Sequence, residues 1–234
     1  MKAIAIIPAR GGSKRVPRKN IRSFDGIPMI AWSIQASISS GCFEKVIVST
    51  DDNEIAEIAR SYGAETPFKR PENLSDDFST TSQVIKHAID FEQSEGRDYD
   101  FVCCIYPTAP FLKKTNLQKG FELIQSELYD YVFSATSFAF PIHRSFTYDH
   151  NDGLQMLFPE HSKTRSQDLN EVYHDAGQFY YGSTLAWLND LKIFSNNSYP
   201  FILPRTEVID IDTEEDFKEA EIKFKLLNSL LLSN

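Results

Sequence analysis

The stretch AIAIIPARGG, residues 3–12, decides the fold. Its first part, Ala3–Ile7, is an unbroken apolar run closed by a proline, which is typical of a strand buried on both faces. Three later runs have the same character, the last less clearly: Lys45–Thr50, Asp100–Tyr106 and Tyr131–Ser137. Strands of this kind predict a mostly parallel sheet covered by helices on both sides.

Helical patterns fill the gaps between these runs. Pro28 suits the first turn of a helix through Ser40, and Gly41 ends it. Further helices are predicted from the capping aspartates Asp51 and Asp52 to Tyr62, over Thr80–Gln93 and over Asn116–Leu128. Strand and helix alternating at this spacing predict crossover connections and an α/β, Rossmann-like fold.

The second half of the chain breaks this alternation. Pro141–Tyr173 is polar and rich in turn residues, and Asn151-Asp152-Gly153 offers a hairpin turn, so we interpret the segment as an insertion arm. Strands are predicted at Gly177–Gly182 and Glu207–Ile211, followed by a helix from about Thr213. We therefore expect a single domain over residues 1–234 with one arm.

Composition excludes several classes of protein. The formal net charge is -9, which argues against general nucleic-acid binding, and the 41% of hydrophobic residues argues against disorder. The three cysteines, Cys42, Cys103 and Cys104, have no zinc or redox spacing, so buried reduced thiols are expected. Ile4–Ile7 is too short for the core of a signal peptide, and no apolar stretch suits a membrane helix. The expectation is a soluble cytoplasmic protein.

The loop after the first strand concentrates positive charge in this acidic chain. Gly11 and Gly12 let the backbone approach an anion, and six cations surround them: Arg10, Lys14, Arg15, Arg18, Lys19 and Arg22. Doubly wound sheets bind ligands at this end of the strands, so a polyphosphate is the predicted ligand. The spacing matches neither a Walker loop nor a dinucleotide fingerprint, and a merely solvated basic loop is the alternative.

A pair of aspartates stands near the C-terminus. In VIDIDTEED, Asp210 and Asp212 alternate with apolar residues and would share one face of a strand. Paired carboxylates suit Mg²⁺, which also binds substrate phosphates. The alternative is helix capping, with Asp212 or Thr213 as the N-cap and Glu215 or Asp216 completing a capping box. Spacing alone leaves the two roles comparable.

The segment IIPARGGSKRVPRKNI, residues 6–21, resembles the N-terminal signature of the acylneuraminate cytidylyltransferase family, enzymes that make CMP-activated nonulosonic acids. The resemblance continues through Arg70–Leu74, Tyr106–Pro110 and Asp210–Asp212. It implies a nucleotide-diphospho-sugar transferase fold, CTP and an acidic nonulosonic sugar as substrates, Mg²⁺ as cofactor and a homodimer.

The resemblance also assigns roles to residues. It implies nucleotide binding by Ala9, Arg10, Gly11, Gly12, Ser13, Lys14, Lys19, Asn20, Arg70 and Thr81. It implies catalytic roles for Arg10, Lys14 and Asp210, and metal binding by Asp210 and Asp212. Without the resemblance, Arg70 is an ordinary cation before a proline and Asn20 an ordinary turn residue.

Two departures from the family pattern concern the sugar. Tyr106 stands where sialic-acid enzymes usually carry glutamine, and a ring there favours a deoxygenated, methyl-bearing sugar. HDAGQFYYG, residues 174–182, replaces the usual Asn-Gly-Ala element. Both resemble the branch that acts on pseudaminic acid, which implies sugar contacts by Tyr106, His174, Asp175, Gln178 and Tyr180. Legionaminic acid, N-acetylneuraminic acid and Kdo are alternative sugars, and a catalytically silent CTP-binding scaffold is an alternative of another class.

Overall fold

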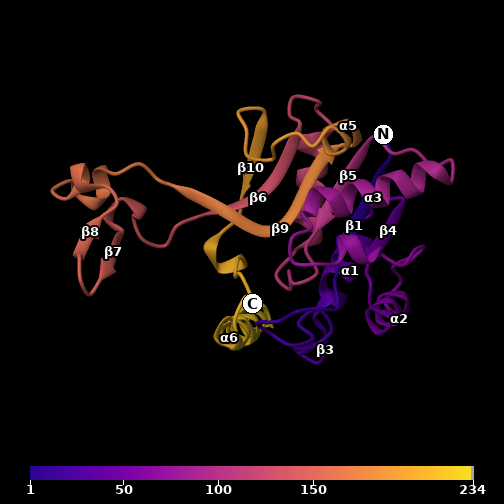
Figure 1. Cartoon of the computed structure of the whole chain (residues 1–234), viewed down its shortest axis with the longest axis horizontal. Coiled ribbons are helices and arrows are strands. Elements are labelled where there is room, and N and C mark those ends of the chain that lie inside the picture. The colour runs from indigo at the N-terminus through magenta and orange to yellow at the C-terminus, as the bar shows by residue number, and fades with distance from the viewer. Residues whose placement is uncertain (233–234) are drawn as a thin grey trace.

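A six-stranded sheet forms the centre of the molecule in the computed structural model, which describes residues 1–232 (Figure 1). The spatial order is β10-β6-β9-β5-β1-β4. The bounds are Ala3–Pro8 (β1), Lys45–Ser49 (β4), Phe101–Ile105 (β5), Tyr131–Ser137 (β6), Tyr173–Ser183 (β9) and Ser198–Ile202 (β10). Strand β9 alone runs antiparallel to its neighbours within this sheet. The four apolar runs are therefore strands, as predicted.

Helices cover both faces of the sheet. Helices α1 (Met29–Ser40), α2 (Asn53–Ser61) and α4 (Lys114–Ile124) supply buried residues to the core on one face. Helices α3 (Thr81–Ser94) and α5 (Thr184–Leu188) do so on the other. The capping predictions hold: Asp52 accepts the amides of Glu54 and Ile55, and Gly41 ends α1 at φ 68°. Helix α4 ends before the predicted Leu128.

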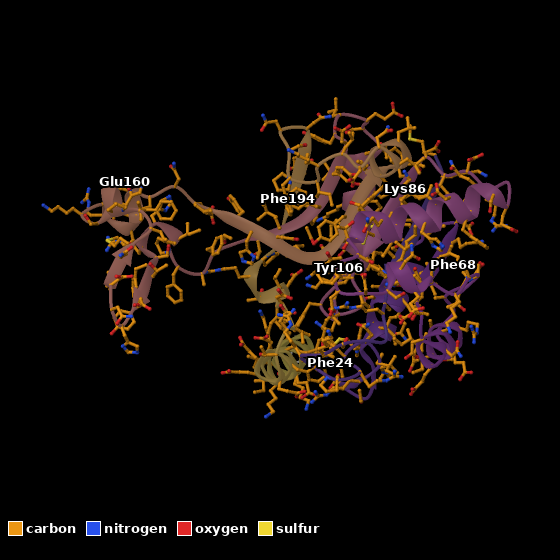
Figure 2. The ribbon with its side chains drawn as sticks, viewed as in Figure 1. Phe24, Phe68, Lys86, Tyr106, Glu160 and Phe194 are labelled. Carbon is orange, nitrogen blue, oxygen red and sulfur yellow. The ribbon has the colours of Figure 1, made fainter. Side chains whose placement is uncertain are left out.

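The C-terminal helix α6 (Glu214–Leu232) packs beside the first loop rather than on the sheet. Phe24, in the short hairpin of β2 (Ser23–Phe24) and β3 (Ile27–Pro28), contacts Phe217 with ring centroids 5.7 Å apart. Figure 2 shows Phe24 beside α6. The helix predicted from about Thr213 is confirmed, and it closes a third apolar cluster against the loop that follows β1.

The insertion arm lies between β6 and β9, so its bounds in the structure are Phe138–Val172. It extends well away from the sheet and carries the hairpin of β7 (Phe146–Asp149) and β8 (Gly153–Met156) at its far end (Figure 1). The predicted hairpin turn is confirmed, since Gly153 has φ 72°. Short 3₁₀ turns complete the arm, at Ile142–Arg144, Pro159–His161 and Ser166–Asp168.

The predicted strand at Glu207–Ile211 is wrong. Strand β10 occupies the sheet edge instead, and its ladder ends where the Leu203 amide donates to the carbonyl of Ala135 at 2.7 Å. Pro204 follows and has no amide to donate, so the chain enters the 3₁₀ turn Arg205–Glu207. A further 3₁₀ turn occupies Glu72–Leu74. No helix within residues 1–232 is long and apolar enough to cross a bilayer.

Candidate active site

A cavity of about 440 Å³ opens at the carboxyl ends of β1 and β5. This is the end at which open α/β sheets bind their ligands. Its wall includes eight of the residues predicted for substrate binding: Arg10, Ser13, Lys14, Lys19, Asn20, Arg70, Thr81 and Tyr106. Segments far apart in sequence thus meet at one cavity.

The glycine pair has a more structural role than predicted. The Gly11 amide donates to the Asp51 carboxylate at 3.0 Å, and a Cβ on Gly11 would lie 2.7 Å from Oδ2 of Asp52. Glycine is therefore required where the loop presses against the start of α2. Gly12 has open space around it, and Ala9 is buried, with its amide donating to the Ser49 carbonyl. These three residues shape the loop and are not among those that line the cavity.

The loop cations are paired with carboxylates from elsewhere in the chain. Arg10 bonds Asp77 at 2.7 Å, and Lys14 bonds the other oxygen of the same carboxylate. The remaining pairs are Arg15 with Asp212, Arg18 with Asp52 and Glu54, Lys19 with Asp212, and Arg22 with Glu214. Acidic residues drawn from several segments therefore balance the concentrated positive charge locally.

Sequence reasoning missed the acidic loop that faces Arg10 and Lys14. The Asp76 carboxylate accepts the amides of Phe78 and Ser79, which fixes a turn that presents Asp77. The two cations lower the pKa of Asp77 below its usual value, with Lys14 the larger cause. The only sequence signal was two acidic residues in SDDFST, and their partners are more than sixty positions away.

Arg70 is the most deeply buried cation of the cavity wall, at 5% exposure. Its guanidinium donates to the hydroxyl of Ser49 at 3.1 Å and to the carbonyl of the same residue. Burial lowers its pKa to about 10. Among the described residues it forms no ion pair, so it stands ready for an electron-rich group of a ligand. Asn20 is also buried, and its amide donates to the Arg10 carbonyl at 2.9 Å.

A wall of aromatic and polar groups adjoins the cations. Tyr106 lies near the middle of the molecule in Figure 2, and its ring centroid is 5.2 Å from that of Tyr180. The Tyr180 hydroxyl donates to Asp175 at 2.5 Å, and the Tyr106 hydroxyl lies 3.4 Å from that of Thr81. Burial raises the pKa of Tyr106, which keeps its hydroxyl neutral. Of the predicted sugar residues, Tyr106 lines the cavity, while Tyr180 and Asp175 connect to it through the Tyr106 ring.

The other two predicted sugar residues lie differently. His174 is exposed, and its ring contacts Phe138 at the root of the insertion arm, 4.7 Å between centroids. Gln178 is 3% exposed, and its Nε2 donates to the Glu207 carbonyl at 2.6 Å. Neither residue is among those lining the cavity, and their contacts with sugar stay a prediction.

The carboxylate pair stands next to the loop cations, although not on a strand. Partial burial raises the pKa of Asp210, and the neighbouring charge of Asp212 raises it further. Thr213, not Asp212, caps helix α6. Its hydroxyl accepts the Asp216 amide, and the Asp216 carboxylate accepts the Thr213 amide. Asp212 is thus not needed as a cap, and its side chain pairs with Arg15 and Lys19.

The carboxylates of Asp210 and Asp212 suit a Mg²⁺ ion that also binds the phosphates of the substrate. Two hard oxygen ligands suit a cation that takes its remaining ligands from water and phosphate. The described residues contain no cluster of three or more histidine, cysteine or acidic side chains placed to enclose a metal alone. The free carboxylate of Asp210 has no ion-pair partner among residues 1–232, which leaves it available as a ligand.

Sheet order, strand-end cavity and cationic loop together define a nucleotide-binding α/β protein of the nucleotidyltransferase type. A profile of the cytidylyltransferase family matches residues 4–227, nearly the whole length. The chain belongs to the cytidylyltransferase family.

Relatives of known activity agree with this assignment. A pseudaminic acid cytidylyltransferase of Campylobacter jejuni is 47% identical over 226 residues, 97% of each chain. A CMP-N,N'-diacetyllegionaminic acid synthase of Legionella pneumophila is 33% identical over 99% of this chain and all of the relative. Among solved structures, a CMP:2-keto-3-deoxy-manno-octonic acid synthetase complexed with CTP has a TM-score of 0.70 at 14% identity, over 97% and 99% of the two chains. That likeness confirms the predicted fold.

Proposed function

We propose that this protein joins CTP to pseudaminic acid and releases pyrophosphate. The observation that carries the proposal is the convergence of the cationic loop, Arg70 and the Tyr106 wall on one cavity at the strand ends. Phosphate, base and sugar require cations, hydrogen-bonding groups and a mixed polar and apolar wall respectively, and the cavity offers all three. Membership of the cytidylyltransferase family and the similarity to pseudaminic acid enzymes support the same reaction.

The reaction is a nucleotidyl transfer. The anomeric hydroxyl of the sugar attacks the α-phosphorus of CTP. Its oxygen forms the new P–O bond and its proton passes to water, while the bond from the α-phosphorus to the bridging oxygen breaks and pyrophosphate leaves with that oxygen. Arg10 and Lys14 would hold the triphosphate after leaving Asp77, and their positive charge balances the charge that develops on the leaving group. Catalysis of this kind depends mainly on positioning and charge neutralisation.

Asp210 and Asp212 are the proposed holders of Mg²⁺. When bound, the ion would neutralise triphosphate charge and draw electrons from the attacked phosphorus. Lys19 connects this pair with the cavity, because its Nζ lies 3.6 Å from Asp212 and also donates to the Ile211 carbonyl. Lys19 would therefore contact both the bound nucleotide and the segment that carries the two carboxylates.

The sugar assignment rests on the aromatic wall. Tyr106 lines the cavity and packs on Tyr180, and the Asp175 carboxylate behind them accepts the Tyr180 hydroxyl and the Gly177 amide. Such a wall suits a methyl-bearing, deoxygenated sugar end better than one rich in hydroxyls. Pseudaminic acid has such an end; legionaminic acid shares it and differs in stereochemistry, so it is the strongest competitor.

We further propose a cytoplasmic homodimer assembled through the insertion arm. The arm's hairpin exposes large apolar side chains: Phe146 at 56%, Tyr148 at 65% and Leu154 at 58%. An arm that extends from the body with exposed apolar side chains is the kind of element that packs on a partner. A dimer would bury these side chains.

One assay tests the reaction and the sugar together. Purified protein is given CTP, Mg²⁺ and one of pseudaminic, legionaminic or N-acetylneuraminic acid, and pyrophosphate release is followed. We expect kcat/KM to be highest for pseudaminic acid. A higher value for either other sugar would contradict the sugar assignment and keep the nucleotidyl transfer. Absence of turnover with all three and with Kdo, together with tight CTP binding, would favour the silent scaffold.

A further inference from the structure

The segment Arg205–Asp212 carries the carboxylate pair but belongs to no sheet. After its 3₁₀ turn it reaches α6 without a ladder bond to any strand within residues 1–232. A strand would have its carbonyls bound by the amides of a neighbour. Side chains from other elements take over that task here.

Lys223 of α6 provides two of these bonds. Its Nζ donates to the Arg205 carbonyl at 2.9 Å and to the Val208 carbonyl at 2.7 Å. Hydrogen bonds from a charged donor are stronger than neutral ones. The lysine therefore ties the first residue of the 3₁₀ turn and the residue that follows the turn to the C-terminal helix.

Gln178 of β9 provides a third bond, to a carbonyl that lies between those of Arg205 and Val208 in the chain. Its Nε2 donates to the Glu207 carbonyl at 2.6 Å, and its buried Oε1 has no partner among the described residues. On the C-terminal side of Asp210, Lys19 donates to the Ile211 carbonyl. Asp210 thus lies between anchored carbonyls at Val208 and Ile211.

We propose that Lys223 and Gln178 are positioning residues, which hold Asp210 and Asp212 at the geometry that a divalent cation needs. The inference rests on the proposed function, because it gives a task to the segment that bears the proposed metal ligands. Mg²⁺ demands near-ideal octahedral geometry, so a ligand-bearing segment without ladder bonds needs other restraints. Neither side chain is among those lining the cavity, so each acts through the backbone of the segment.

Lys223→Met and Gln178→Met remove the donors while keeping side-chain bulk. Lys225→Met is a control on the same helix, where the side chain is exposed. Gln118→Met is a control for the glutamine, since its Nε2 also donates to a backbone carbonyl, that of Ser40 at 2.9 Å, away from the segment. Lys223→Arg keeps a charged donor and should retain most of the wild-type behaviour.

The measurement is Mn²⁺ binding to the complex of each protein with CTP in the absence of sugar, followed by electron paramagnetic resonance, together with the melting temperature. Loss of a group that orients metal ligands typically weakens metal affinity about tenfold to a hundredfold. We expect that loss in Lys223→Met and Gln178→Met, little change in the two controls, and a parallel rise in the Mg²⁺ concentration needed for half-maximal velocity. A merely structural role would lower the melting temperature and leave the Mn²⁺ affinity of the folded protein unchanged.

Wild-type affinity for Mn²⁺ in both methionine variants would overturn the inference, whatever their melting temperatures. If Lys223→Met does not fold, the comparison of Gln178→Met with Gln118→Met decides. A wild-type protein that binds no Mn²⁺ and forms no CMP-sugar would overturn the proposed function and this inference with it. A wild-type protein that does both, with variants equal to it, would overturn this inference alone.

Discussion

Replacing Arg70 by methionine should leave the stability of the protein nearly unchanged and impair nucleotide binding. The pKa of Arg70 falls from 12.5 to about 10, chiefly because burial disfavours the charged guanidinium. One pKa unit corresponds to about 1.4 kcal/mol, so burying this charge costs about 3 kcal/mol. At pH 7 the group is charged in the folded and unfolded states alike, and the cost is present in full; it would be relieved only as the pH rises through 10.

The bonds that methionine removes offset this gain. Arg70 donates to the hydroxyl and the carbonyl of Ser49, and two such bonds from a charged donor contribute about 3 kcal/mol together. The Ser49 carbonyl keeps the Ala9 amide as a donor at 2.9 Å, so it is not left without a partner. The gain and the loss are about equal, and the buried Ser49 hydroxyl loses its partner, so the melting temperature of the free protein should change by less than about 2 °C.

The assay compares thermal unfolding with and without CTP. Arg70→Met should melt within about 2 °C of the wild type when free and gain much less from CTP, with kcat/KM reduced about tenfold or more. Lys69→Met is the matched control, because this neighbouring cation is exposed. A free variant that melts several degrees lower would show that Arg70 is a structural cation. A variant that folds and binds CTP as the wild type does would refute the ligand role.

Four further outcomes are expected. Lys14→Ala should lower kcat/KM at least tenfold, whereas Lys119→Ala, an exposed lysine on α4, should not; equal activities would place the triphosphate elsewhere. Asp210→Asn should nearly abolish pyrophosphate release without changing the melting temperature, and turnover in excess EDTA would contradict the metal requirement. Burial alone would raise the pKa of Glu92, but its bonds to Arg97 and Lys45 lower the pKa overall. The ionised carboxylate therefore stabilises the fold above its ordinary pKa of 4.5, and this stabilisation is lost as the pH falls through the lower pKa of the folded state. Glu92→Gln should lower the free energy of unfolding in urea by about 3 kcal/mol at pH 7, and by less in acid. The double change Tyr148→Asp and Leu154→Asp should convert a dimer into a monomer in sedimentation, and an unaltered sedimentation coefficient would exclude the insertion arm as the interface.

The first half of the fold could be predicted because its signals are local. Ala3–Ile7 reads as a buried strand without knowledge of its neighbours, and Asp52 and Gly41 mark helix ends by their own chemistry. Strand β10 was missed because Pro200 interrupts it, and a proline reads as a break in any strand that is not at an edge. Only the assembled sheet shows that β10 lies at the edge, where a missing amide is tolerated.

The length of strand β9 was underestimated because its pairing, too, is defined only in the assembled sheet. Its pairing with β6 shifts between Phe133 and Ala135, whose partners are Tyr180 and Asp175. The additional residues include Gly177 at φ 60° and form a bulge. Regular alternation would send Asp175 and Tyr180 to opposite faces, whereas the bulge brings the two side chains into contact. Resemblance named both residues, but their contact depends on a bulge that one sequence does not reveal.

The difference between local signals and contacts made only in the assembled fold also explains how an acidic protein carries a cationic loop. Glycines and cations between Arg10 and Arg22 predict an anion site from local sequence alone. Their partners Asp77, Asp212 and Glu214 come from segments that are distant in sequence and are brought close by the fold. Because these pairs are largely exposed, they hold the cations in place weakly, and a triphosphate that carries several charges on adjacent groups competes well for them. The acidic residues therefore do not oppose the predicted anion site; they keep its cations near the cavity and neutralised until a stronger anion binds.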